Sequence, residues 1–259
     1  MNHSKKRNKI QNEALKLKKK GLVYDSKKYL ANNGFCNTVD IALLTIKEGE
    51  LNVLLIQRKE DPFKNCWAIP GGFVEANESA LKSAERELRE ETGIPYLYLE
   101  QLYTFTEKGR DPREEIANTP TRIWSVAHFA LVEYQRYSKL VAGSDAKRAK
   151  WFKVSKLPKL AFDHAEIIAM AIERVRGKIS YTNIGFELVP EQFTMTELQH
   201  VFEAVRGEKL DRNNFRTKIL SLNILQKTGK FKNEGPGKPA PYYRFDRDEM
   251  DSIRHRDLI

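Results

Sequence analysis

Three glutamates, Glu87, Glu90 and Glu91, stand at positions i, i+3 and i+4 of a stretch that reads as a helix beginning near Glu78. This spacing places their carboxylates on one strip of the helix surface. They lie at the negative end of the helix dipole, and Glu87 and Glu91 repel each other. A hard divalent cation would reverse both penalties, so the strip predicts a metal site. A solvated acidic face is the alternative interpretation of the spacing alone.

The flanking residues predict how this helix is positioned. Leu81, Ala84 and Leu88 form an apolar stripe beside the carboxylates, which predicts that the helix docks on a core. Gly93 stands where a left-handed residue commonly ends a helix. Two glycines precede the helix at residues 71–72, and glycine permits the backbone to approach a ligand closely.

The stretch from Gly71 to Ile94, GGFVEANESALKSAERELREETGI, resembles the Nudix hydrolase signature at every fixed position. The resemblance implies a Nudix fold, an α/β/α sandwich with a mixed sheet, in which Mg²⁺ or Mn²⁺ is held against a diphosphate. It makes Gly72 and the three glutamates the metal site, and one glutamate could also activate water. Arg86 would orient a carboxylate, and Glu78 would support the loop or the metal shell. The chemistry fits, because a pyrophosphate needs its charge neutralised and a water aligned with phosphorus.

Length, charge and cysteine content limit the kinds of protein that this chain can be. The chain has 259 residues, enough for two domains, and its net charge of +10 favours polyanionic partners, nucleic acid among them. No apolar run approaches the roughly 20 residues of a membrane span, and the basic N-terminus has no apolar core of a secretory signal. Cys36 and Cys66 have neither metal-ligand nor disulfide-framework spacing, so we expect reduced thiols in a cytoplasmic protein.

A second set of segments predicts the scaffold of a Nudix domain at residues 37–177. Residues 39–46 and 51–58 read as a hairpin of strands covered on both faces, as in a sheet between helices. Arg58, at the end of the second strand, is a predicted substrate contact together with Gly71 and Gly72. Further strands are predicted at residues 67–69, 97–106, 122–132 and 150–153, and a helix at residues 162–176.

The segment GRDPR at residues 109–113 lies between two predicted strands. A surface turn is the simplest interpretation, because Asp-Pro is a common turn dipeptide. The segment also resembles the ADP-ribose pyrophosphatase branch of the Nudix family. That resemblance implies that Arg110 and Arg113 fork onto phosphate or ribose oxygens. The chain departs from the branch by an insertion, residues 114–121, which leaves the roles of Glu114 and Glu115 open.

The N-terminal extension, residues 1–36, is strongly basic. It reads as a flexible arm or one polar helix, and either a solvated tail or an accessory DNA-binding arm is consistent with its charge. The basic residues that define it are Lys5, Lys6, Arg7, Lys9, Lys16, Lys18, Lys19 and Lys20.

The C-terminal segment, residues 178–259, has a different pattern. A helix starting at Thr194 or Thr196 and a second helix at residues 212–222, with Asp211 as N-cap, precede a glycine- and lysine-rich hairpin at residues 226–245. This order predicts a winged helix-turn-helix, although a helical appendage with a solvated basic face is the alternative. The predicted DNA contacts are Arg212, Asn213, Arg216 and Lys218 on the second helix and Lys230, Lys232 and Lys238 in the wing.

Residues 160–220, followed by the wing, resemble the Nudix-related transcriptional regulators, the NrtR family. The resemblance implies a homodimer that represses genes of NAD or sugar metabolism and leaves its double-stranded DNA operator when ADP-ribose, or a related nucleoside diphosphate derivative, binds. Because the Nudix box is intact, we expect hydrolysis to AMP and ribose 5-phosphate as well. Two alternatives stay open: a housekeeping pyrophosphatase whose C-terminal domain only dimerises, and a ligand-sensing repressor with negligible turnover.

Overall fold

The computed structural model describes residues 3–22, 35–95, 97–117, 121–138, 146–233 and 238–246. The chain divides into two compact units, and each is considered by itself. The first comprises Met1–Leu43, Val53–Ala130 and Lys139–Ala171. The second comprises Leu44–Asn52, Leu131–Ser138 and Ile172–Ile259.

The larger sheet has seven strands within the described residues and runs in the order β3-β2-β1-β6-β5, with β4 paired to β1 and β7 to β2. The long strands β1 and β2 are buried along most of their length, as their apolar runs predict. The strands are β1 (Phe35–Lys47), β2 (Glu50–Arg58), β3 (Trp67–Ala68), β4 (Gly71–Phe73), β5 (Glu100–Phe105), β6 (Arg122–Leu131) and β7 (Ala146–Lys153).

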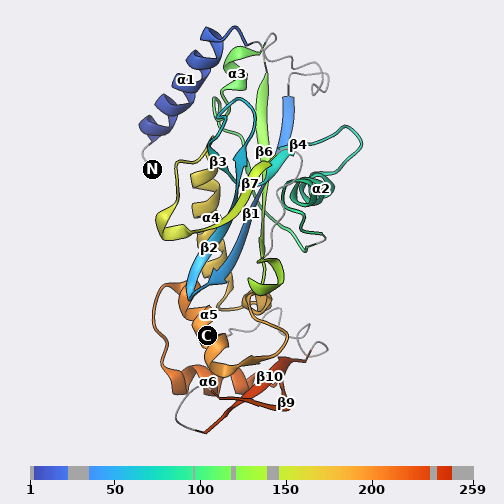
Figure 1. The fold of residues 1–259 in the computed structure, drawn as a ribbon, viewed down its shortest axis with the longest axis vertical. Helices are drawn as coiled ribbons and strands as arrows, with labels where there is room; N and C mark the ends of the chain where they lie inside the picture. The colour runs from blue at the N-terminus through green and yellow to red at the C-terminus, as the bar shows by residue number, and fades with distance from the viewer. Residues whose placement is uncertain are drawn as a thin grey trace. The chain divides into compact units, whose positions relative to one another are not determined.

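Helices cover this sheet. Figure 1 shows α2 on one side of the sheet and α4 on the other. The predicted α/β sandwich is therefore confirmed. The helices are α1 (His3–Lys19), α2 (Ala80–Thr92), α3 (Arg113–Ile116) and α4 (His164–Lys178), with 3₁₀ turns η2 (Gln135–Tyr137) and η3 (Val154–Lys156).

Helix α2 has well-defined ends. It begins at Ala80, two residues after Glu78, and the side chain of Ser79 caps it by accepting a hydrogen bond from the Lys82 N–H at 3.3 Å. Gly93 ends it in the left-handed conformation, with φ of 70°, as predicted. Ala84 and Leu88 are buried, but Leu81 is 44% exposed. The predicted apolar stripe is therefore one residue too long.

Helix α1 corrects the interpretation of the N-terminus as a solvated tail. Ile10, Ala14 and Leu17 are at most 4% exposed, and their spacing of i, i+4 and i+7 makes one buried face on a helix that is otherwise basic. The polar-helix alternative was right about the conformation and missed the apolar face.

The second unit contains a three-stranded sheet in the order β8-β10-β9 within its described residues. The predicted winged helix-turn-helix is confirmed, with α5 and α6 preceding the hairpin of β9 and β10. Its elements are η4 (Asn183–Leu188), β8 (Phe193–Thr194), α5 (Met195–Arg206), α6 (Arg212–Ser221), β9 (Leu225–Lys232) and β10 (Ala240–Phe245).

Both helices of this unit begin with side-chain caps. Thr194 and Glu197 form a reciprocal capping box at the start of α5, and Asp211 caps α6 by accepting from the Asn214 N–H at 2.8 Å. Phe215 and Ile219 of α6 are buried, as predicted. These contacts determine which face of α6 is exposed.

Across the described ranges, no helix is both long and apolar enough to cross a bilayer.

Candidate functional site

The three glutamates of α2 line a cleft of about 720 Å³ in the first unit. The glycine pair at the start of β4 and two arginines from other elements line the same cleft. The structure thus brings together eight residues that the sequence predicts for the site, namely Arg58, Gly71, Gly72, Arg86, Glu87, Glu90, Glu91 and Arg113.

The two glycines permit contacts that no other residue would allow. A Cβ on Gly71 would lie 2.2 Å from the carbonyl oxygen of Val39, on the paired strand β1. A Cβ on Gly72 would lie 2.1 Å from Oε1 of Glu87. Real Cβ atoms do not approach other atoms this closely. At Gly71 the obstacle is backbone, so this position requires glycine, whereas at Gly72 the side chain of Glu87 would have to move. The backbone of β4 can therefore lie directly against the acidic face of α2.

Arg86 organises the carboxylates around it. Its Nε donates to Oε1 of Glu78 at 2.9 Å, and its Nη1 donates to Oε1 of Glu87 at 2.8 Å. Its Nη1 also lies 3.4 Å from Oε2 of Glu90. The hydrogen bond from Arg86 lowers the pKa of the Glu78 carboxyl group. This is the carboxylate-orienting geometry that the sequence predicts for Arg86.

Glu90 and Glu91 differ in exposure. Glu91 is only 5% exposed, and its Oε2 accepts a hydrogen bond from the Gly71 N–H at 2.9 Å. The Glu90 side chain is 45% exposed. The carboxylates therefore extend from the base of the cleft to its open side.

The oxygen donors of this cleft suit a hard divalent cation. Among the described residues, no three acidic, histidine or cysteine side chains form a preassembled metal cluster. Mg²⁺, however, is usually held by one or two carboxylates together with substrate phosphates. Together with the close approach of Glu87 to Gly72, the donor set fits an ion that binds with a diphosphate.

Arg58 and Arg113 present guanidinium groups to the cleft. Arg58 Nε donates to the Pro62 carbonyl oxygen at 2.8 Å, and the group lies 4.9 Å from the centre of the Phe162 ring. Burial lowers the pKa of Arg58. Arg113 pairs with Asp111 and lies 4.6 Å from the Phe73 ring centre. Aromatic rings and carboxylates thus hold both arginines in place.

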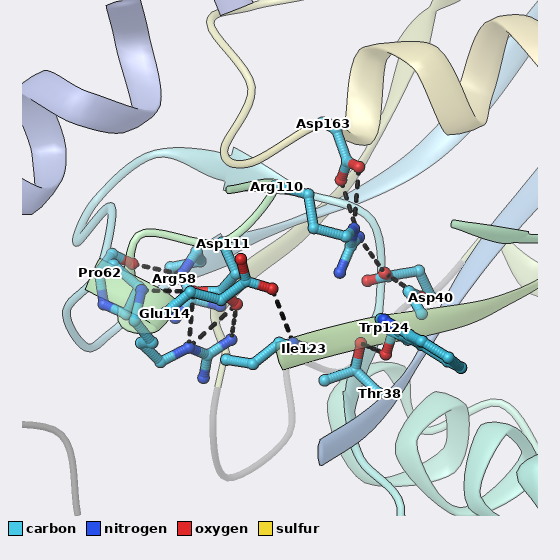
Figure 2. A network of polar contacts seen from close by, with 12 residues as sticks. Thr38, Asp40, Arg58, Pro62, Arg110, Asp111, Glu114, Ile123, Trp124 and Asp163 are labelled. Atoms are coloured by element: carbon cyan, nitrogen blue, oxygen red, sulfur yellow. Dashed lines mark hydrogen bonds and ion pairs between the residues drawn. The ribbon is translucent and has the colours of Figure 1, made fainter. Parts of the chain in front are cut away.

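Arg110 is buried and paired with two aspartates. Its side chain is 3% exposed, and it donates to both oxygens of Asp163, at 2.9 and 2.8 Å, and to Asp40 at 3.3 Å (Figure 2). Burial alone would lower its pKa, but Asp163 and Asp40 outweigh that effect and raise it. Its Nε and Nη2 are thus held by these two aspartates, and a contact of Arg110 with substrate phosphate or ribose stays a prediction.

Asp40 and His164 are site residues that the sequence analysis missed. His164 accepts the Ile69 N–H at its Nδ1, at 3.1 Å, and its Nε2 lies 3.2 Å from Oδ1 of Asp40. Burial would raise the pKa of Asp40, but His164, Arg110 and a 2.5 Å hydrogen bond from Ser125 lower it to about 2. This network supports the segment that leads into Gly71. The sequence offered one signal for Asp40, namely an acidic residue inside the otherwise apolar strand β1.

Glu114, the first residue of the insertion after GRDPR, has well-defined hydrogen-bond partners. Its two carboxylate oxygens accept from the N–H group of Gly109, at 2.6 Å, and from that of Ile123, at 2.7 Å; Figure 2 shows the contact with Ile123. Burial raises the pKa of this carboxyl group. Glu114 therefore closes the loop between β5 and β6 and has a structural role. The last part of the insertion, residues 118–120, lies outside the described residues.

The predicted DNA contacts lie on the second unit. Six of the seven are exposed: Arg212, Asn213, Arg216 and Lys218 on α6, and Lys230 and Lys238 in the wing. Lys232 differs, because its Nζ pairs with Oε1 of Glu197 at 2.6 Å and the residue is half-buried. Lys232 is therefore less available for a DNA contact than the six exposed residues.

The two units correspond to known families. Residues 35–171 match the NUDIX domain family, and residues 185–245 match the NrtR DNA-binding winged helix domain. The fold and the cleft therefore define a Nudix domain joined to a winged helix domain.

Relatives specify the class further. The chain is 36% identical over 220 residues to the ADPR responsive transcriptional repressor NtrR of Acinetobacter baylyi, an alignment that covers 83% of each chain. It is 38% identical over 128 residues to the ADP-ribose pyrophosphatase of Methanocaldococcus jannaschii, covering 49% of this chain and 70% of the relative. The solved structure of Shewanella oneidensis NrtR complexed with a 27mer DNA matches with a TM-score of 0.71 and 35% identity, over 85% of this chain and 97% of that one. The chain belongs to the NrtR family of Nudix-related transcriptional regulators.

Proposed function

We propose that this protein is a transcriptional repressor that responds to ADP-ribose, and that its Nudix domain also hydrolyses the ligand. Water would add across the phosphoanhydride bond, giving AMP and ribose 5-phosphate. The names of the Acinetobacter and Methanocaldococcus relatives support the ligand, and the intact acidic strip supports turnover.

One observation carries the hydrolytic part: the carboxylates of α2, the glycine pair and two arginines share one cleft. Glu87, Glu90 and Glu91, beside Gly72, would hold Mg²⁺ or Mn²⁺. A bound divalent ion supplies charge neutralisation and lowers the pKa of a coordinated water. Arg58 and Arg113 would contact the anionic substrate, since guanidinium groups suit phosphate oxygens. Arg86 keeps the carboxylates in position through its hydrogen bonds.

The DNA-binding part rests on the exposed cations of α6 and the wing. In a winged helix the second helix enters the major groove, and the wing contacts the backbone. Cations that contact phosphates release counterions, so affinity should fall steeply with salt. The homodimer and the cytoplasmic location expected from the sequence remain predictions. For ADP-ribose to release DNA, it must bind more tightly to the arrangement that does not bind DNA.

A paired assay tests this proposal. A gel shift on DNA upstream of the protein's own gene, with and without ADP-ribose, is run beside an assay for AMP with Mg²⁺. We expect a shift that ADP-ribose abolishes, together with AMP formation. AMP without any gel shift would indicate the housekeeping pyrophosphatase. A ligand-sensitive shift without AMP over hours would indicate the pure sensor.

A further inference from the structure

Helix α1 lies outside both matched segments, which begin at residues 35 and 185. It is nevertheless attached to the Nudix unit by specific polar contacts. Lys9 Nζ donates to the carbonyl oxygens of Leu160 and Phe162, the latter at 2.9 Å. The Phe63 N–H donates to Oε1 of Glu13 at 3.0 Å. Such contacts at two successive turns define one docked position for the helix.

A third contact anchors the C-terminal end of α1. Lys20 Nζ lies 2.7 Å from Oδ2 of Asp61, and this contact lowers the pKa of the Asp61 carboxyl group. Asp61 and Pro62 line the cleft that contains the acidic strip. The end of α1 is therefore held against the rim of that cleft.

The apolar face of α1 shares a core with the site. Ile10 packs in a buried cluster with Ile56, Phe63 and Phe162, among others. Ile56 lines the same cleft as the three glutamates, and Phe162 lies beneath the guanidinium group of Arg58. Burial and hydrogen bonding thus attach α1 to residues that form or support the site.

Two leucines, one in α1 and one in the short segment that follows it, line the cleft. Leu17, buried, and Leu22, which is 42% exposed, line it together with Ile116 and the three glutamates. Most of the remaining lining is charged or glycine. The leucines therefore give a polar cleft an apolar portion that the Nudix signature does not encode.

We propose that α1 is a wall of the ligand cleft and a specificity-determining element, with Leu22 contacting the nucleoside part of a nucleoside diphosphate. This rests on the proposed function, because it assigns the apolar end of the same ligand. The acidic side chains, through a metal ion, and the basic side chains would bind the diphosphate. The base of the nucleoside has apolar faces, so burying it against leucine would stabilise the complex. A ligand that contacts α1 also stabilises its docked position, because it binds that state preferentially.

Kinetics of the full-length protein test the contact. Leu22→Ala should raise the KM for ADP-ribose roughly three- to tenfold and leave kcat nearly unchanged, because the lost methyl groups serve binding and not the reacting atoms. Leu15→Ala is the matched control: Leu15 is on α1, seven residues before Leu22, is 56% exposed and does not line the cleft. An equal KM for wild type and Leu22→Ala overturns the inference, as does an equal rise for Leu15→Ala.

Limited proteolysis supplies a second readout. Lys18, Lys19 and Lys20 are exposed near the end of α1, so trypsin can report its docking. ADP-ribose should slow cleavage at these lysines in wild type and less so in Leu22→Ala. Calorimetry on wild type separates the two proposals. Absence of ADP-ribose binding overturns both, whereas binding without protection of α1 overturns only the role of the helix.

Discussion

The acidic strip of α2 and the basic face of α6 differ in how their charged side chains are held. In the cleft, the carboxylates of Glu87 and Glu91 have specific partners, Arg86 and the Gly71 N–H, within 3 Å. On α6, Arg212, Arg216 and Lys218 are exposed. A site for a small ligand needs donors held in one geometry before the ligand arrives. A surface for a polyanion needs long cations that can adapt to a phosphate backbone.

Because of this difference, we expect the removal of one charged side chain to have a larger effect in the cleft than on the DNA-binding face. In the first unit a lost partner leaves a buried charge without compensation, so stability or catalysis should fall sharply. On the DNA-binding face a lost charge should weaken binding in small, nearly independent steps. Four predictions test this difference, in order of decreasing expected effect.

The largest effect is expected from Asp163→Asn. The change removes one charge from the buried pair with Arg110, and breaking such a pair costs about 3–5 kcal/mol of stability. Thermal unfolding measures the loss, with Glu85→Gln as a control on a partly exposed acid outside the cleft. A loss as small as that of the control would mean that Arg110 is solvated, and would remove the contrast between the units.

Glu91→Gln should lower kcat for ADP-ribose hydrolysis by roughly 10²–10³-fold, since metal-assisted charge stabilisation is worth several kcal/mol. The amide oxygen can still accept the Gly71 N–H, so the fold should be retained. AMP release measures the rate, and circular dichroism checks the fold. Operator binding should be unchanged. Joint loss of hydrolysis and DNA binding would contradict two separable sites.

Arg216→Ala should weaken operator binding by about 1–3 kcal/mol and leave hydrolysis intact, because an arginine on a recognition helix reads a base or a phosphate. Fluorescence anisotropy with labelled operator measures the affinity. Arg206→Ala is the control, because Arg206 ends α5 and pairs with Glu208 at 2.6 Å. Equal effects of the two changes would argue for a diffuse electrostatic surface instead of a defined recognition helix.

The smallest effect should distinguish two neighbouring lysines of the wing. Lys230→Ala should reduce the slope of log affinity against log salt by about one, the expectation for one phosphate contact. Lys232→Ala should reduce it less, because Lys232 is already paired with Glu197. The measurement is a salt titration of operator binding. A larger change for Lys232 would show that the pair with Glu197 opens on DNA.

Much of the molecule was predictable from local pattern. The caps of α2, α5 and α6 and the spacing of Glu87, Glu90 and Glu91 depend on residues a few positions apart. The ion pairs of Arg110 were not predicted, because its partners Asp163 and Asp40 are 53 and 70 residues away. No local rule brings such groups together; only the completed sheet does.

The N-terminal helix was misjudged for a different reason. Its three buried residues, Ile10, Ala14 and Leu17, were readable as a helical stripe, but the surrounding lysines dominated the interpretation. Lysine is compatible with such a face because its methylene stem can cover apolar surface while its amine remains hydrated. Charge content alone is therefore a poor guide to whether a basic segment docks.

The absence of a side chain at Gly72 has one more consequence. A single added methyl group would overlap the carboxylate of Glu87, which would have to turn away from its present position. Under the proposed function, Gly72→Ala would therefore displace one proposed metal ligand and give a receptor that binds its ligand without hydrolysing it. In a repressor, that exchange would convert a signal that consumes itself into one that persists.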